Sequence, residues 1–172
     1  FSDTNVYSLA LDCSLPVIAA MQGHGIGGGF VMGLYADLVI MAREAVYTTN
    51  FMRYGFTPGM GATYIMQRKL GIALTEEMLL AADTYRGATL QQRGIPFPVL
   101  PRSQVLVHAH ARARALASTP RNALQLLKRH LVEEMRAALP AVIRAEVAMH
   151  EQTFPNEDVK ARIQDTFGRA AP

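Results

Sequence analysis

Five glycines fall within seven residues in the segment Gly23-His24-Gly25-Ile26-Gly27-Gly28-Gly29. Glycine costs about 1 kcal/mol per helical position relative to alanine, so this segment cannot be an ordinary helix. The apolar run Leu15–Met21 precedes it and is typical of a buried strand, because it is too short for a buried helix. A short helix is expected to follow, from Phe30 to Tyr35. The pattern predicts a tight turn where the backbone approaches another group closely.

The rest of the chain alternates short apolar runs with helical segments and then becomes helical. Strands are expected at 38–41 and 45–49, a loop at 54–61 and an extended segment at 95–101. Helices are expected at 62–70, at 76–82 after the N-cap Thr75, at 89–94, and at 103–118 after Ser103. Pro120 and Pro140 are each expected at the first position of a helix, the second over 141–154. This order indicates an α/β fold with a helical tail.

Length and composition exclude several classes of protein. A chain of 172 residues suggests one domain. With 50% apolar and 18% charged residues it is not a disordered chain, and its longest apolar stretches are too short to span a membrane. No segment has the layout of a signal peptide, and Cys13 is the single cysteine. A disulfide framework is therefore excluded, and a reducing, cytoplasmic compartment is expected.

The charge is distributed unevenly along the chain. Residues 84–132 contain no Asp or Glu and eight basic residues, whereas the remainder has nine basic and 14 acidic residues. This asymmetry fits a surface for an acidic partner, or solvated helix faces whose charges are dispersed in space. Because no aromatic residue lies among the bases between Val99 and Val132, nucleic-acid binding has little support.

The glycine turn has two further interpretations besides a plain turn. Gly23, Gly25 and Gly28 match the dinucleotide fingerprint GxGxxG, with Glu44 downstream. The span to the next strand is, however, short for such a crossover, and the Gly-Lys-Ser/Thr ending of a phosphate loop is absent. The other interpretation is an oxyanion hole, because N–H groups at the start of a helix have no partner within it.

Longer segments carry a resemblance to a known family. LPVIAAMQGHGIGGGFVMGLYADLVI, then PGMGAT at 58–63, then AADTYRGATLQQRGIPFPVLP, are similar to the crotonase (enoyl-CoA hydratase/isomerase) superfamily. The resemblance implies a ClpP-like α/β spiral of ββα units. It implies one domain, with 1–102 as the C-terminal portion of the spiral core and 103–172 as a helical trimerisation region. Because crotonase-type chains are usually longer, the chain that begins at Phe1 is expected to lack an N-terminal part.

The sequence departs from the hydratase pattern at two positions. Hydratases of the family use two Glu residues to activate water, and the matching positions here are Val31 and Phe51. No ordinary hydratase activity is expected without a base there. Decarboxylation of an unsaturated diacyl thioester needs neither carboxylate, because an oxyanion hole stabilises the dienolate that forms. Residues 50–63 resemble the decarboxylating homologues of polyketide β-branching cassettes, which convert 3-methylglutaconyl to 3-methylcrotonyl on an acyl carrier protein.

The resemblance also implies roles for individual residues. Gly28 would supply one oxyanion N–H, with the second donor on a segment preceding this chain, and His150 would be the proton donor. The expected pocket residues are Ile26, Gly27, Val31, Asn50, Phe51, Met52 and Tyr54. From the residues alone His150 stays ambiguous, because it shares a helix face with Ile143, Val147 and Phe154 and could equally be a core histidine.

The partners and alternatives follow from the same resemblance. The substrate is expected on the phosphopantetheine of an acyl carrier protein or of CoA, with no metal, no other cofactor, no nucleic acid and no membrane. His24 is interpreted as a turn residue, and His108, His110 and His130 lack the partners of a metal site. A homotrimer is expected. An enoyl-thioester isomerase or hydratase of the same family, and a non-catalytic acyl-thioester-binding module, stay open as alternatives.

Overall fold

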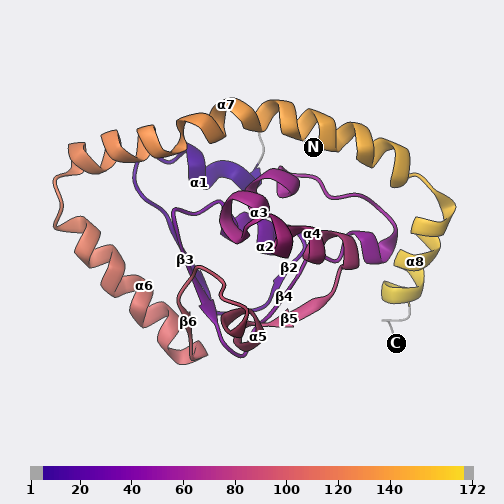
Figure 1. Cartoon of the computed structure of the whole chain (residues 1–172), viewed down its shortest axis with the longest axis horizontal. Coiled ribbons are helices and arrows are strands. Elements are labelled where there is room, and N and C mark those ends of the chain that lie inside the picture. Colours follow the sequence, from indigo (N-terminus) through magenta and orange to yellow (C-terminus); the bar gives the residue numbers. More distant parts are fainter. Residues whose placement is uncertain (1–5, 169–172) are drawn as a thin grey trace.

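The computed structural model describes residues 6–168, and its strands form two small sheets (Figure 1). One sheet is parallel, in the order β1 (Ile18–Met21), β3 (Leu38–Ala42), β6 (Val99–Leu100). The other has the order β2 (Gly25–Ile26), β4 (Val46–Thr48), β5 (Thr84–Arg86), with β2 and β4 parallel and β4 and β5 antiparallel. The successive strands β1 and β2, and again β3 and β4, change sheet before the chain turns into helix, as in a ββα spiral, so the predicted fold class is confirmed.

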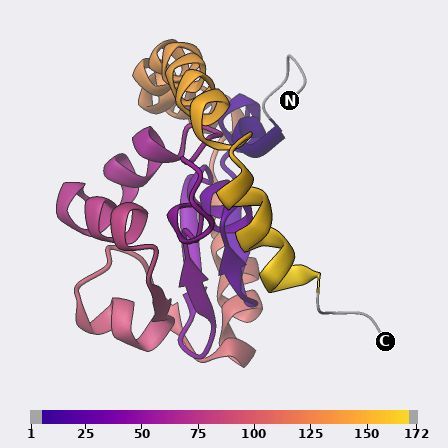
Figure 2. The same ribbon diagram turned by 90° about the vertical axis from the view of Figure 1, so that its right-hand side faces the viewer.

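The helices cover the sheets and extend beyond them. The core contains η1 (Val6–Ser8), α1 (Leu9–Asp12), α2 (Gly28–Leu34), η2 (Met52–Tyr54), α3 (Ala62–Leu70), α4 (Ile72–Ala81) and α5 (Gly87–Gln92). Three helices follow: α6 (Arg102–Ala117), α7 (Arg121–Thr153) and α8 (Glu157–Phe167). Figure 1 shows α7 arching over the whole molecule, with α6 and α8 descending from its two ends, and Figure 2 shows α7 end-on above the sheets. No helix of the described residues is long and apolar enough to cross a membrane.

The glycine turn contains a strand that the sequence did not predict. β2 lies inside the turn and pairs Ile26 with Thr48 of β4. The chain therefore enters the second sheet before it reaches α2, which is not the direct strand-to-helix step of a dinucleotide-binding fold. The preceding strand begins at Ile18 and not at Leu15.

Pro140 does not begin a helix, contrary to the prediction. It lies inside α7, which is 33 residues long. Proline removes one N–H and costs a helix interior about 3 kcal/mol. Leu139 is buried and Ile143 packs against the core, so the same apolar face continues across Pro140 and offsets this cost. The helix α8 falls within the region 103–172 that is expected to be helical, although the sequence predicts no separate helix after Phe154.

The predicted N-cap at Thr75 is also wrong. The helix α4 begins directly after Gly71, and Thr75 lies within it with 1% of its surface exposed. The Thr75 N–H donates to the carbonyl of Gly71, so it already makes a helical hydrogen bond. Packing of α4 on α3 decided this start, and the local capping preference of threonine did not.

A buried ion pair fastens α7 to the spiral. Lys128 is 4% exposed, and its Nζ donates to Asp37 Oδ2 at 2.7 Å and to the carbonyls of Ala10 and Leu15. The same Asp37 oxygen accepts the N–H of Val17 at 2.6 Å. Lys128 therefore stabilises the fold, although it lies in the segment 84–132 whose basic residues could have faced an acidic partner.

Candidate active site

The glycine turn leaves two N–H groups at the start of α2 without a partner in the part of the chain that the structure describes. Gly27 has φ 53°, donates its N–H to the Thr48 carbonyl at 2.9 Å, and accepts from the N–H groups of Phe30 and Val31. No acceptor among residues 6–168 pairs with the N–H of Gly28 or of Gly29. Since α2 has only seven residues, these N–H groups matter more than its dipole.

Glycine is required at position 28 by close neighbours. A Cβ built on Gly28 would lie 2.8 Å from ring carbon Cε1 of Tyr7 and 3.1 Å from Sδ of Met60. The first distance is shorter than a real carbon contact, and the second is tighter than nearly all such contacts, so a side chain here forces a neighbour aside. The sequence predicted this close approach of the backbone but did not show what approaches it.

A second glycine-containing turn precedes α3 and is held from α7. The N–H of Gly61 donates to Glu146 Oε2 at 2.6 Å, and the N–H of Thr63 donates to Oε1 at 2.8 Å. Glu146 is 1% exposed, and burial raises the pKa of its carboxyl, although these hydrogen bonds oppose the shift. The Tyr35 hydroxyl donates to the carbonyl of Met60 at 2.7 Å. Burial and the nearby Glu146 both raise the pKa of Tyr35.

An aromatic cluster connects the loop after β4 with the C-terminal part of α7. The ring of Phe56 lies at its centre, edge-on to Phe51 at 6.0 Å and to His150 at 5.5 Å, and stacked on Tyr54 at 6.2 Å. The imidazole therefore belongs to the same apolar wall as the predicted pocket residues Phe51 and Tyr54.

The hydrogen bond of His150 defines its tautomer. Its Nδ1 lies 3.0 Å from the carbonyl oxygen of Thr57, and its ring stacks on Phe154 at 4.7 Å. A carbonyl oxygen only accepts, so Nδ1 carries the hydrogen of this bond. With Nδ1 protonated, Nε2 carries a hydrogen only in the imidazolium form of the ring.

Asn50 and Phe51 join the glycine turn to the aromatic cluster. A Cβ on Gly27 would lie 3.0 Å from Asn50 Oδ1 and 3.6 Å from the Phe51 ring. Asn50 Nδ2 donates to the Tyr54 hydroxyl at 3.3 Å. The structure thus gathers most of the predicted site residues in one continuous region.

The other three predicted pocket residues lie differently. Ile26 is 50% exposed on β2, and Met52 is 40% exposed beside a depression shared with Arg53 and Leu80. Val31 has no exposed surface and packs in the core. The apolar character of positions 31 and 51 is accordingly part of the packing of the molecule.

The remaining histidines do not form a metal site. His24 Nδ1 accepts the N–H of Val46 at 3.0 Å, so it fastens the glycine turn to the start of β4. Within residues 6–168 no three His, Cys, Asp or Glu side chains lie close enough to hold a metal ion.

Sequence reasoning missed three residues of the site region. Phe56 and Met60 lie in the predicted loop 54–61, where nothing local shows that their side chains turn inward. Tyr7 precedes Gly28 by 21 residues in a segment without periodicity. These contacts depend on the path of the chain in space, which no local pattern contains.

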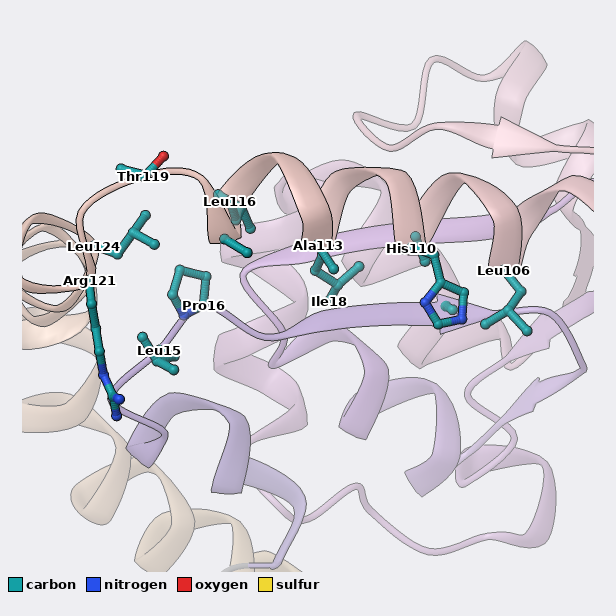
Figure 3. A pocket seen from close by; sticks show the side chains of 13 residues that line it. Leu15, Pro16, Ile18, Leu106, His110, Ala113, Leu116, Thr119, Arg121 and Leu124 are labelled. Atoms are coloured by element: carbon teal, nitrogen blue, oxygen red, sulfur yellow. The ribbon is translucent and has the colours of Figure 1, made fainter.

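A groove that contains none of these site residues lies elsewhere on the described part of the molecule. Figure 3 shows this groove of about 530 Å³ between α6 and the segment around β1. Its walls are mainly apolar, with Leu15, Leu106 and Leu116 among them, and Arg121 stands at one end.

Comparison with known proteins identifies the family. Residues 1–168 match the model of the enoyl-CoA hydratase/isomerase family, so the chain belongs to that family, as its resemblance predicted. It is 62% identical over 168 residues to the bacillaene synthase decarboxylase PksI of Bacillus subtilis (strain 168), covering 98% of this chain and 68% of that protein. The chain spans about two thirds of the length of such relatives.

Solved structures narrow the class further. A structure from a dehydratase/decarboxylase enzyme couple of polyketide β-branching superposes with a TM-score of 0.94 at 63% identity, covering 95% of this chain and 67% of that one. The decarboxylase domain of CurF from Lyngbya majuscula gives 0.93 at 44% identity, covering 97% and 69%. Within its family the chain is therefore a decarboxylase-type crotonase of polyketide biosynthesis.

Proposed function

We propose that the protein decarboxylates 3-methylglutaconyl carried on an acyl carrier protein and yields 3-methylcrotonyl on the same carrier. The observation that carries this proposal is the pair of open N–H groups at Gly28 and Gly29, set beside an apolar wall that begins at Phe51. An N–H donor fits a thioester oxygen on which charge develops. Because this wall carries no carboxylate, it does not repel the carboxylate of the substrate.

The reaction has two steps. The bond between the carboxylate carbon and the acyl chain breaks, CO₂ leaves, and the electron pair delocalises into a dienolate whose thioester oxygen accepts from the Gly28 N–H. His150, which enters this step as the imidazolium, then gives its Nε2 proton to the carbon that lost CO₂, and the neutral ring recovers a proton from water. The hydrogen bond from Nδ1 to Thr57 supports this role, because it keeps the ring oriented while the proton moves.

The other predicted residues shape the pocket in this proposal. Gly27 and Asn50 border the thioester and Phe51 and Tyr54 form the acyl wall, while Ile26 and Met52 stand at its exposed margin and Val31 supports it from the core. The thioester arm is the phosphopantetheine of a carrier protein or of CoA, and no metal takes part.

The test follows CO₂ release in the full-length protein. Carrier-bound 3-methylglutaconyl is incubated with enzyme, and the loss of CO₂ is followed by mass spectrometry. His150→Ala should lower kcat by about a hundredfold, the contribution of a positioned proton donor. His130→Ala, on the exposed side of the same helix, is the matched control and should keep the wild-type rate. Thioester binding without any turnover by the wild type would instead favour a binding module.

The carrier protein is proposed to dock on exposed arginines of α6 and the start of α7. Lys128 is buried in an ion pair and Arg93 pairs with Glu77, so these two bases are unavailable to a partner. Arg112, Arg114 and Arg121 are exposed. Reversing their charge should raise KM for the carrier-bound substrate in a salt-dependent way and leave KM for the CoA-bound substrate unchanged. Equal effects on both substrates would exclude this surface.

A homotrimer is proposed, with the C-terminal helical region 103–172 of the single domain at the contact. Five large apolar residues of α6 and α7 are about half or more exposed: Leu106, Val107, Leu126, Leu127 and Leu131. A monomer rarely leaves such a surface in water. Leu131→Asp should shift the mass measured by light scattering from trimer to monomer, and an unchanged trimer would contradict this contact.

A further inference from the structure

The turn before α3 contains a strained residue that the proposed chemistry does not use. Met60 has φ 68°, in the left-handed region that residues with side chains rarely adopt. Two groups hold it there: the Tyr35 hydroxyl donates to its carbonyl, and Glu146 accepts the N–H of the next residue, Gly61. Tyr35 and Glu146 are each only 1% exposed. Because two buried groups hold this strained backbone conformation, the Met60 side chain leaves the backbone in one direction.

That direction is toward the glycine turn. Sδ of Met60 lies 3.1 Å from the point where a Cβ of Gly28 would stand, and Cε1 of Tyr7 lies 2.8 Å from the same point. The side of Gly28 on which a Cβ would stand is therefore covered by a thioether and an aromatic ring. Gly28 is the first residue of a helix with only seven, so its neighbours and not a long helix keep its N–H aimed.

We propose that Met60 is a positioning residue for the Gly28 N–H, and that Tyr35 and Glu146 act through Met60. This inference rests on the proposed oxyanion role of Gly28. A donor that loses this support can shift while charge grows on the thioester oxygen, and a displacement of about 1 Å is enough to slow a reaction by up to about a hundredfold. The long helix α7 then contributes to catalysis at two points, through His150 and through Glu146.

The experiment uses two variants of the full-length protein that separate strain from side-chain contact. Met60→Ala removes the thioether and keeps the left-handed strain, whereas Met60→Gly removes both. Met60→Leu refills the space and is the conservative rescue. Met135→Ala, which truncates a partly buried methionine of α7 that packs on the core, is the matched control. Each protein is measured for kcat, KM and thermal stability.

A second readout reports on the N–H group itself. Infrared spectra are recorded with bound 3-methylcrotonyl-CoA carrying carbon-13 at the thioester carbonyl, because a hydrogen bond to this oxygen lowers its stretching frequency. Both Met60→Ala and Met60→Gly should lose part of this shift and lower kcat by about tenfold or more, with KM changed by less than about twofold. Met60→Gly should be at least as stable as Met60→Ala, and Met60→Leu should recover much of the rate.

The outcomes distinguish the two proposals. If the wild type shifts the carbonyl frequency and Met60→Gly keeps that shift and the wild-type kcat, Met60 only fills space and the inference is overturned. If the wild type shows no shift at all, the oxyanion role of Gly28 fails, and the positioning role fails with it. A loss of activity in Met135→Ala equal to that in Met60→Ala would also overturn it.

Discussion

The molecule contains two helix starts that are built alike and finished differently. Both α2 and α3 begin after a glycine with positive φ, Gly27 at 53° and Gly61 at 79°. Before α3, the carboxylate of Glu146 accepts the N–H groups of Gly61 and Thr63. Before α2, the Gly28 N–H has no acceptor among residues 6–168.

The start of α3 therefore serves the fold, whereas the start of α2 serves the proposed chemistry. An anion from the protein itself satisfies the turn before α3, and that turn becomes a rigid support. Within residues 6–168 no anion fills the turn before α2, so a ligand oxygen that gains negative charge can take that place. The two turns also touch, since Met60 of the one packs on Gly28 of the other.

Removing the internal anion should have the largest effect. Glu146→Ala leaves the donors of Gly61 and Thr63 buried without an acceptor, and the free energy of unfolding should fall by about 3 kcal/mol. Chemical denaturation of the full-length protein measures it, with Glu151→Ala on the exposed face of α7 as control. A loss equal to that of the control would show that Glu146 does not hold this turn.

A side chain at the open helix start should act on catalysis more than on folding. Gly28→Ala forces Tyr7 or Met60 aside and displaces the N–H, so kcat should fall by about a hundredfold. Gly23→Ala is the matched control, because nothing lies within 4 Å of a Cβ there. Steady-state kinetics decides, and a Gly28→Ala enzyme with the control's kcat would remove Gly28 from the mechanism.

The anchor on the Met60 carbonyl should contribute less. Tyr35→Phe removes one hydrogen bond and keeps the ring, so the free energy of unfolding should fall by about 1 kcal/mol. Tyr47→Phe is a useful comparison, since its hydroxyl also bonds backbone within the core. An unchanged stability in Tyr35→Phe would mean that the Gly61–Glu146 bond alone maintains the strain at Met60.

The smallest expected effect is a pH dependence of stability that arises from Glu146 in the turn before α3. Burial raises the pKa of Glu146 above its ordinary 4.5, so the folded protein holds this proton more tightly than the unfolded chain. The stability contribution is then present in acid and is lost as pH rises through the folded pKa. Wild type should lose stability relative to Glu146→Gln as pH rises above 4.5 toward neutrality, measured by denaturation. The opposite slope would show that the hydrogen bonds outweigh burial.

Local pattern predicted the glycine turn, β3, β4 and α3 well, because each depends on nearby glycines or on a short apolar run. It failed at Pro140 and Thr75, where the buried faces of α7 and α4 overrode local preference. In the site, Gly28 and Phe51 could be singled out from a resemblance. The roles of Tyr7 and Phe56 could not, since their partners are distant in the sequence.

The sequence by itself determined that the chain is a crotonase and that positions 31 and 51 carry no acid. A glycine run and two apolar residues are properties of single positions, so they can be read without coordinates. Only the tertiary structure decided which helix start stays open. The acceptor that closes the other one, Glu146, lies 85 residues from Gly61, and hydrogen bonds across such a separation exist only once α7 has folded over the spiral.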